Sequence, residues 1–353
     1  MILETDGLSH RYGAETALSE VSFGLAAGEV VGLLGPSGCG KTTAVQAVAG
    51  HVRPTAGRIR LRGRDVTDDP PESRRVGLVF QESALFPHMT ARENVAYGLA
   101  GRTGVDERAA VADEYLDLVD LGAQREAYPG QLSGGQKRRV EIARALAPEP
   151  DVLLLDEPLS GLDRTLREDL RGEIARVQRE TGVATLFVTH DQAEAMAVSD
   201  RLVVMRAGEV AAVGEPRRLY ESPPSPFVAS FLGRSNRLRA TVTGVDPPTL
   251  SLGDREFPHE GAVGFEPGSP VVCHVRPEAL ALSPTEGELT LRGTVSRSTD
   301  LGRRYDVQVR TSAGTLTVEC AAAPPESGET VPVAFATGDL SVFAADSPAE
   351  PAE

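Results

Sequence analysis

The sequence has almost no lysine: of its 36 basic residues, only Lys41 and Lys137 are lysines, and the rest are arginines. Two alternatives are open for such a composition: codon bias in a GC-rich genome, or an acidic surface adapted to salt. The chain also lacks a basic tract, and its net charge is −15. Because binding to a phosphate backbone depends on clustered Lys and Arg, nucleic acid is not expected as a partner. A lysine kept at position 41 points to a specific task there.

Long apolar runs are missing as well. No stretch approaches the roughly 20 residues of a membrane-spanning helix, so the chain is not expected to cross a membrane by itself. The first residues have neither the basic start nor the apolar stretch of a secretory signal, which predicts a protein kept in the cytoplasm. The three cysteines, Cys39, Cys273 and Cys320, have the spacing of neither a metal site nor a disulfide framework, and we expect separate thiols.

A length of 353 residues predicts two domains, at about 150 residues each. Over residues 1–235, short apolar runs alternate with helical stretches, which predicts an α/β domain. The runs are continuous, as in strands buried on both faces. They cover residues 29–34, 76–80, 152–155, 184–188 and 201–205, and the helical stretches cover 41–48, 106–121, 136–146, 166–180 and 192–198.

The texture of the sequence changes after Gly233. Short β-rich segments separated by Gly, Pro and Asp predict a small all-β barrel over residues 236–345. Residues 346–353 contain only Pro, Ala, Ser and acids, which predicts a disordered tail.

One segment between a predicted strand and a predicted helix fits the pattern G-x-x-x-x-G-K-[ST]. Its residues are Gly35, Pro36, Ser37, Gly38, Cys39, Gly40, Lys41 and Thr42, followed by Thr43. In such a loop the glycines let backbone N–H groups converge on phosphate oxygens, and the helix N-terminus favours negative charge. Lys41 would reach the β- and γ-phosphates, and the Thr42 hydroxyl would bind Mg²⁺.

A second buried strand ends in two carboxylates, Asp156 and Glu157. We expect Asp156 to hold Mg²⁺ through water and Glu157 to act as the general base on the attacking water. The simpler alternative is that both acids only cap the turn at Pro158.

The pentapeptide Leu132-Ser133-Gly134-Gly135-Gln136 resembles the signature of the ATP-binding subunits of ATP-binding cassette (ABC) transporters. A capping Ser133, the N–H groups of two glycines and a helix dipole make a second anion site. The resemblance implies a P-loop cassette with a helical subdomain at about residues 90–147. It also implies ATP as cofactor, held in a head-to-tail homodimer between one chain's loop and Ser133, Gly134, Gly135 and Gln136 of the other.

The same resemblance assigns four further residues. Tyr12 would stack on adenine, and Gln81 would contact the metal and the water. Asp163 lies in the D-loop, residues 160–163, which crosses the dimer interface. His190 would contact the γ-phosphate. With Glu157, residues Gln81 and His190 make the expected catalytic set, and Thr42, Gln81 and Asp156 the expected metal set.

Residues 80–90 resemble importer subunits for inorganic ions, polyamines and sugars. Residues 275–278 and 301–305 resemble the TOBE domain, a barrel of oligonucleotide-binding type attached to many such importers. The resemblance implies uptake of an inorganic ion or a polyamine. It implies two membrane-spanning permease subunits as partners, an extracytoplasmic solute-binding protein as an indirect one, and a place at the cytoplasmic face of the membrane. A sugar importer and a soluble ABC ATPase remain alternatives. Lys137-Arg138-Arg139 and Gln131 depart from the usual pattern without removing a catalytic group.

Overall fold

The computed structural model describes residues 1–99, 104–284 and 288–345, so the predicted tail lies outside the described residues. The chain divides into two units, Met1–Pro216 and Arg217–Glu353. The change in sequence composition predicts a later boundary, after Gly233. The earlier division has a physical cause in Arg276, whose guanidinium donates to the carbonyl oxygens of Ala229 at 2.7 Å and Tyr220 at 3.0 Å. These bonds attach helices α7 (Pro216–Glu221) and α8 (Pro226–Phe231) to the second unit.

The first unit is built on a six-stranded sheet with the order β10-β9-β3-β8-β7-β6, parallel except for the β9–β10 pair. The strands are β3 (Val30–Leu34), β6 (Val76–Val79), β7 (Val152–Asp156), β8 (Ala184–Thr189), β9 (Arg201–Arg206) and β10 (Glu209–Gly214). Successive residues of β7 enter different cores: Val152 and Leu154 pack on one side, and Leu153 and Leu155 on the other. Burial on both faces is the reason that residues 152–155 of this strand are all apolar.

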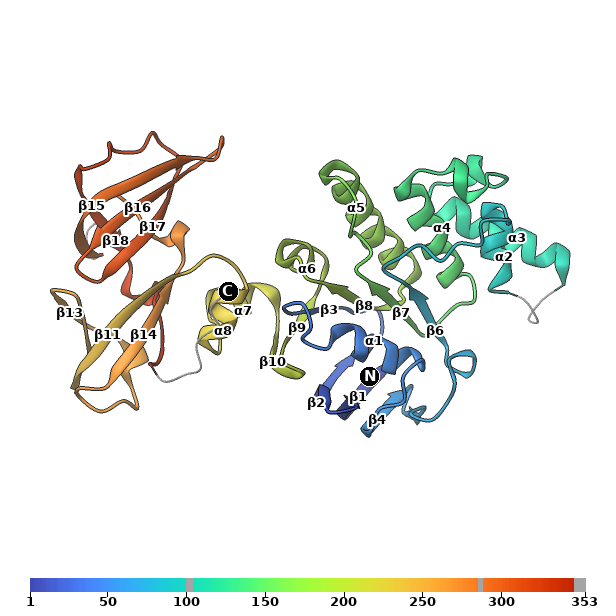
Figure 1. Ribbon diagram of the computed structural model, residues 1–353, viewed down its shortest axis with the longest axis horizontal. Helices are drawn as coiled ribbons and strands as arrows, with labels where there is room; N and C mark the ends of the chain where they lie inside the picture. Colours follow the sequence, from blue (N-terminus) through green and yellow to red (C-terminus); the bar gives the residue numbers. More distant parts are fainter. Residues whose placement is uncertain (100–103, 285–287, 346–353) are drawn as a thin grey trace. The chain divides into compact units, whose positions relative to one another are not determined.

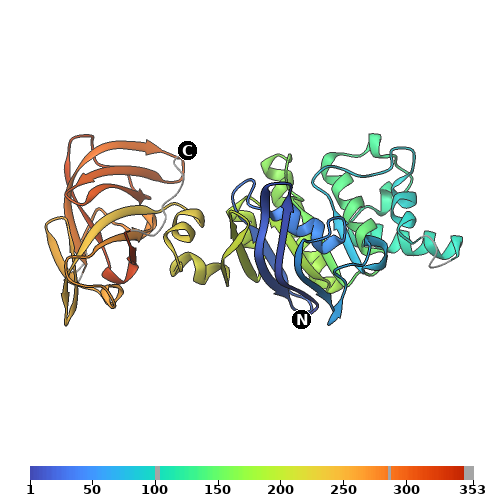
Figure 2. The same cartoon turned by 60° about the horizontal axis from the view of Figure 1, so that its bottom comes forward.

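Different layers cover the two faces of this sheet (Figures 1 and 2). On one side, α1 (Lys41–Ala49) lies between it and an antiparallel sheet of order β2-β1-β4-β5. That sheet contains β1 (Leu3–Tyr12), β2 (Glu15–Leu25), β4 (Ala56–Leu61) and β5 (Arg64–Asp65). On the other side lie α5 (Arg164–Thr181) and α6 (Gln192–Val198).

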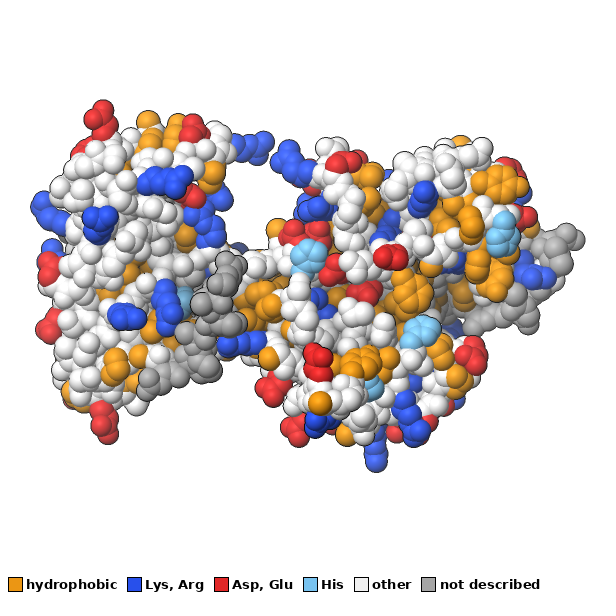
Figure 3. Space-filling view, viewed as in Figure 1, with side chains coloured by type: hydrophobic (Ala, Val, Ile, Leu, Met, Phe, Trp, Pro, Cys, Tyr) orange, Lys and Arg blue, Asp and Glu red, His pale blue; other side chains and the backbone are white. Residues whose placement is uncertain are grey.

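A helical subdomain extends from the same unit. It contains α2 (Ala91–Tyr97), α3 (Val105–Leu118) and α4 (Gly134–Leu146), and residues 100–103 of this segment lie outside the described residues. Ion pairs join its parts: Arg92 Nε lies 2.7 Å from Asp113 Oδ1, and Arg125 Nη2 lies 2.6 Å from Asp117 Oδ2. On the face that Figure 3 shows, hydrophobic side chains also reach the surface over these helices.

The second unit is β-rich, as the sequence predicts. Its strands form two antiparallel sheets, β13-β12-β11-β14-β19 and β17-β16-β15-β18, which share one core. Alternation along β11 shows the pattern, because Leu238 and Ala240 are buried while Arg237 and Arg239 are exposed. The strands are β11 (Asn236–Val245), β12 (Pro248–Leu252), β13 (Arg255–Pro258), β14 (Pro270–Val275), β15 (Leu289–Asp300), β16 (Tyr305–Thr311), β17 (Gly314–Cys320), β18 (Thr330–Phe335) and β19 (Ser341–Ala344).

Across the described ranges of both units, every helix is too short or too polar to traverse a bilayer.

His274 on β14 makes the stability of the second unit depend on pH. Its side chain is 4% exposed, Nδ1 lies 3.0 Å from Ser235 Oγ, and Nε2 is buried without a hydrogen-bond partner among the described residues. Burial, helped by Arg237 and Arg276, lowers the pKa of His274 to about 4. The unfolded chain therefore binds the proton more readily between pH 4 and 6.5, and stability falls as the pH falls through this window.

Replacing His274 by Asn should remove this dependence. The difference in unfolding free energy between the native chain and the variant should shrink by roughly 2–3 kcal/mol from pH 6.5 to 4. Calorimetric unfolding at several pH values measures it, with exposed His88→Asn as the matched control. If the difference in unfolding free energy between the native chain and His274→Asn stays constant from pH 6.5 to 4, the prediction is contradicted.

Candidate functional site

The glycine-rich loop lies between β3 and α1, as its motif requires. Lys41 begins α1 and is 7% exposed. Its Nζ donates to the carbonyl oxygens of Gly35 at 2.8 Å and Pro36 at 3.0 Å. The ammonium group is thus fixed within the loop. Thr42 is exposed next to it, and Thr43 is half-buried.

Two glycines of the loop have no room for a side chain. Gly40 has φ 102°, in the left-handed region, and a Cβ there would lie 2.4 Å from the carbonyl oxygen of Ala17. A Cβ at Gly35 would lie 2.4 Å from the carbonyl oxygen of Met205. The loop therefore packs directly on backbone from β2 and β9, which fixes where its N–H groups converge.

Asp156 ends β7 with its side chain buried, at 8% exposure. Burial raises the pKa of the Asp156 carboxyl and neighbouring Glu157 raises it further, while Lys41 and Arg138 act in the opposite direction. Two carboxylates so close together favour a cation beside them. The buried Asp156 carboxylate and the exposed Thr42 hydroxyl are the hard oxygen donors that Mg²⁺ prefers.

A metal site made by protein side chains alone is not present: in residues 1–99, 104–284 and 288–345, no three His, Cys, Asp or Glu side chains are grouped so that they could hold a metal. Mg²⁺ usually keeps several waters and uses one or two carboxylates together with substrate phosphates. The residues present fit that mode of binding.

Glu157 joins the other two expected catalytic residues. Its Oε2 accepts a hydrogen bond from Gln81 Nε2 at 3.0 Å, and its Oε1 lies 3.0 Å from His190 Nδ1. The three residues follow β6, β7 and β8, and parallel strands bring these ends to one edge of the sheet. Glu157 has φ 46°, which is uncommon for a residue with a side chain. A hydrogen bond of 2.9 Å from its N–H to the carbonyl of Val188 holds this backbone in place.

The signature segment makes a helix start. Ser133 caps α4, its Oγ accepting from the N–H of Gln136 at 3.2 Å, while Gln136 Oε1 accepts from the N–H of Ser133 at 2.9 Å. Ser133 and Gly134 are both exposed at this helix start. Gly135 is buried, and a Cβ there would lie 2.7 Å from Leu166 Cδ1.

The last two sequence-predicted residues stand at element ends. Tyr12 ends β1 with 51% exposure, its ring edge-on to His10 at a centroid distance of 4.5 Å. Asp163 caps α5, its Oδ1 accepting from the N–H of Leu166 at 3.0 Å. The exposed Tyr12 ring can stack on a planar ligand.

Arg138 and Glu141 are not among the residues predicted from the sequence, although they support the Gln81 segment. Arg138 donates to the carbonyl oxygens of Phe80 and Gln81, the latter at 2.7 Å, and pairs with Glu141 Oε2 at 2.9 Å. Glu141 Oε1 also accepts from the N–H of Ala84 at 2.8 Å. The signature helix therefore holds the backbone around Gln81. Opposite charges three residues apart on one helix face were the available signal.

Two known protein families match parts of this chain. The family described as "ABC transporter" matches residues 18–160, and the family described as "TOBE domain" matches residues 273–343. These ranges contain the loop, the signature and both carboxylates in one case, and β15 to β18 in the other.

The chain is also similar along most of its length to curated proteins. It is 45% identical over 311 residues to "Fe(3+) ions import ATP-binding protein FbpC 1" of Rhizobium meliloti (strain 1021), covering 87% of each chain. It is 44% identical to "Spermidine/putrescine import ATP-binding protein PotA" of Acidothermus cellulolyticus, covering 86% of this chain and 81% of that one. It is 46% identical to "Sulfate/thiosulfate import ATP-binding protein CysA 2" of Chromobacterium violaceum, covering 80% and 76%.

Among solved structures, the chain resembles the ATP-binding cassette MJ0796, determined as a dimer in a post-hydrolysis state bound to ADP and phosphate. The TM-score is 0.54 and the identity 31%, over 61% of this chain and 99% of that one.

Proposed function

The chain belongs to the ABC transporter family as an ATP-hydrolysing subunit with a C-terminal TOBE domain, and from this premise we propose that it drives uptake of an inorganic ion or a polyamine. Relatives named for import of Fe³⁺, spermidine or putrescine, and sulfate support this solute class. The solute would be delivered by an extracytoplasmic binding protein and pass through two membrane-spanning permease subunits. The chain would act at the cytoplasmic face of the membrane.

The proposed chemistry is hydrolysis of ATP by water. The loop N–H groups and Lys41 would hold the phosphates, and Tyr12 would stack on the adenine. Thr42, Asp156 and Gln81 would hold Mg²⁺, which would neutralise charge that develops on the phosphates. Glu157 would accept the proton of the attacking water, with Gln81 and His190 fixing the carboxylate from either side.

Two copies of the chain would complete the site. Ser133 and Gly134 are exposed at the start of α4, whereas the loop that holds Lys41 begins α1. A head-to-tail homodimer would present the Ser133–Gln136 segment and Asp163 of one copy to the nucleotide of the other. The dimeric state of the similar cassette MJ0796 supports this arrangement. Closure would exclude water from the site before hydrolysis.

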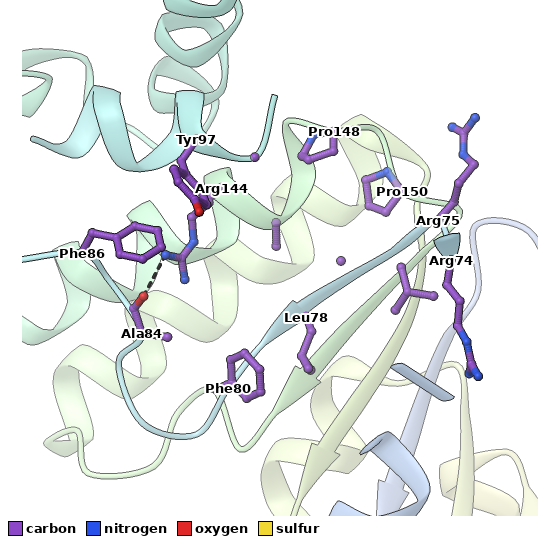
Figure 4. A pocket seen from close by; sticks show the side chains of 14 residues that line it. Arg74, Arg75, Leu78, Phe80, Ala84, Phe86, Tyr97, Arg144, Pro148 and Pro150 are labelled. Carbon is purple, nitrogen blue, oxygen red and sulfur yellow. Dashed lines mark hydrogen bonds between the residues drawn. The ribbon is translucent and has the colours of Figure 1, made fainter. Parts of the chain in front are cut away.

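A groove of about 500 Å³ between β6 and the helical subdomain is the proposed docking site for a permease segment. Phe80, Phe86, Tyr97 and Arg144 line it (Figure 4). Arg144 Nη1 donates to the carbonyl oxygen of Ala84 at 2.8 Å, and its guanidinium lies 5.7 Å from the Phe86 ring centroid. The groove wall therefore belongs to the segment that carries Gln81. This continuity from groove to Glu157 is the observation that carries the proposal of coupled transport.

Placing a charge in this groove should uncouple the subunit from its permease. Tyr97 is 54% exposed at the end of α2, so Tyr97→Asp is expected to fold and to hydrolyse ATP at the native rate in isolation. Its affinity for the permease subunits with which it assembles should fall about 30-fold, the effect of losing an interface anchor. ATP-driven uptake of Fe³⁺, sulfate or spermidine into proteoliposomes should fall with it.

Val213→Asp is the matched control, because Val213 is an exposed apolar residue on β10 outside the groove. Equal loss of permease binding in both variants, or native uptake by Tyr97→Asp, would reject the groove as the docking site. Uptake of none of the three solutes by the native complex would reject the proposed solute class.

A further inference from the structure

Arg167, in the first turn of α5, contacts two separate functional loops. Its Nη2 donates to the carbonyl oxygen of Leu162 in the D-loop at 3.1 Å. Its other nitrogens face the loop that carries His190: Nη1 lies 3.8 Å from Asp191 Oδ2, and Nε lies 3.5 Å from Glu194 Oε1. We propose that Arg167 is a positioning residue that couples the D-loop to His190, an inference that rests on the proposed function of both.

Glu194 carries this contact onward to the backbone on both sides of His190. Its Oε2 accepts from Thr189 Oγ1 at 2.7 Å, and Thr189 Oγ1 accepts from the N–H of Asp191 at 3.0 Å. Asp191 Oδ1 in turn accepts from the N–H of Ala193 at 2.8 Å at the start of α6. The residues before and after His190 are therefore fixed through one carboxylate.

Arg167 supplies the positive charge that lies beside the Glu194 carboxylate. The Glu194 side chain is only 8% exposed. Burial raises the pKa of Glu194, and nearby Asp191 raises it too, while the Thr189 hydrogen bond, Arg167 and His190 lower it. A buried carboxylate without a cation is costly, so Glu194 is expected to follow Arg167 when Arg167 moves.

The geometry leaves room for such a movement. Ion-pair distances of 3.5 and 3.8 Å exceed those of a well-formed charge-assisted hydrogen bond. A small displacement of the D-loop, through the Leu162 carbonyl, would therefore tighten or loosen the guanidinium on Glu194. Closure of the dimer at the D-loop would then affect the position of His190 in the same chain.

A lysine cannot replace this arginine. The guanidinium presents several donors in one rigid plane, so it reaches a carbonyl and two carboxylates at once, whereas an ammonium is a single point charge. Arg179, further along α5, is the matched control, because its Nε donates only to the Ala175 carbonyl of its own helix in the contacts that the structure describes.

The test uses single-turnover ATP hydrolysis by the full chain at enzyme excess. Arg167→Gln should lower the rate about tenfold, within the range of coupling through a packed network. ATP affinity and thermal stability should stay close to native. Arg167→Lys should also be slow, and Arg179→Gln should be native. A native rate for Arg167→Gln, or a loss explained by weaker ATP binding, would overturn the proposal.

A double-mutant cycle with His190 then separates coupling from a general effect. If Arg167 acts through His190, adding Arg167→Gln to the His190→Ala chain should lower its hydrolysis rate only slightly further. A full tenfold loss in that background would show that Arg167 acts elsewhere. If His190→Ala alone hydrolyses ATP at the native rate, the proposed role of His190 itself fails, a result distinct from a native rate in Arg167→Gln.

Discussion

Glu157→Gln is expected to bind ATP normally and to hydrolyse it about 10²- to 10⁴-fold more slowly, the usual contribution of a general base. The amide preserves the shape of the side chain but cannot accept the proton of the attacking water. It also disturbs the local hydrogen bonds, because one of its two ends is now a donor. Gln81 Nε2 and His190 Nδ1 both meet a carboxylate oxygen in the native chain.

Steady-state hydrolysis and nucleotide retention measure this prediction together. Because hydrolysis no longer reopens the interface, the variant with ATP should remain a dimer in size-exclusion chromatography, whereas the native chain should return to monomers. Exposed Glu209→Gln on β10 is the control for loss of one negative charge. Hydrolysis by Glu157→Gln at the native rate would show that another group takes the proton.

Mixing two inactive variants is expected to restore one ATP site. Lys41→Ala removes the ammonium from the loop, and Ser133→Arg places a bulky cation where the signature would meet the nucleotide. Each homodimer should be inactive. In the mixed dimer, the Ser133→Arg chain keeps an intact loop, and the Lys41→Ala chain faces it with an intact signature. The opposite site carries both defects.

Photo-crosslinking with an ATP analogue detects the restored ATP site, and the two chains are made different in size so that each can be identified. The Ser133→Arg chain should become labelled only when the Lys41→Ala chain is added. Ser133→Ala serves as a control for the lost helix cap, which costs about 1 kcal/mol of stability. Labelling that does not change on mixing would mean that each copy closes on its own nucleotide, and the shared site would be wrong.

The parallel core could be predicted from sequence because its strands are buried on both faces. Continuous apolar runs predicted the bounds of β3, β7 and β8 to within about one residue. The antiparallel sheet was missed, since β1 is only partly buried and its pairing with β2 contains register shifts. Neither condition leaves a clean alternation in the sequence. β1 also pairs with the distant β4, which no local pattern reports.

The loop residues could be predicted because a single motif fixes their chemistry and their order along the chain. The spacing of Arg138 and Glu141 could have indicated their ion pair. It could not indicate the hydrogen bonds from Arg138 to the Gln81 segment, because these join residues that are 57 and 58 positions apart. Arg167 gave no signal for a similar reason: its partners follow two different strands, and only the fold brings them together.

The burial of Lys41 also shapes how the chain responds to amine-reactive reagents. Its Nζ is held by two carbonyl oxygens of the loop, and the only other lysine in the sequence is Lys137, in the first turn of α4. A dye ester at limiting dose thus has one preferred side-chain target, four positions after Ser133. A fluorophore attached there would report the approach of a second copy without any engineered cysteine.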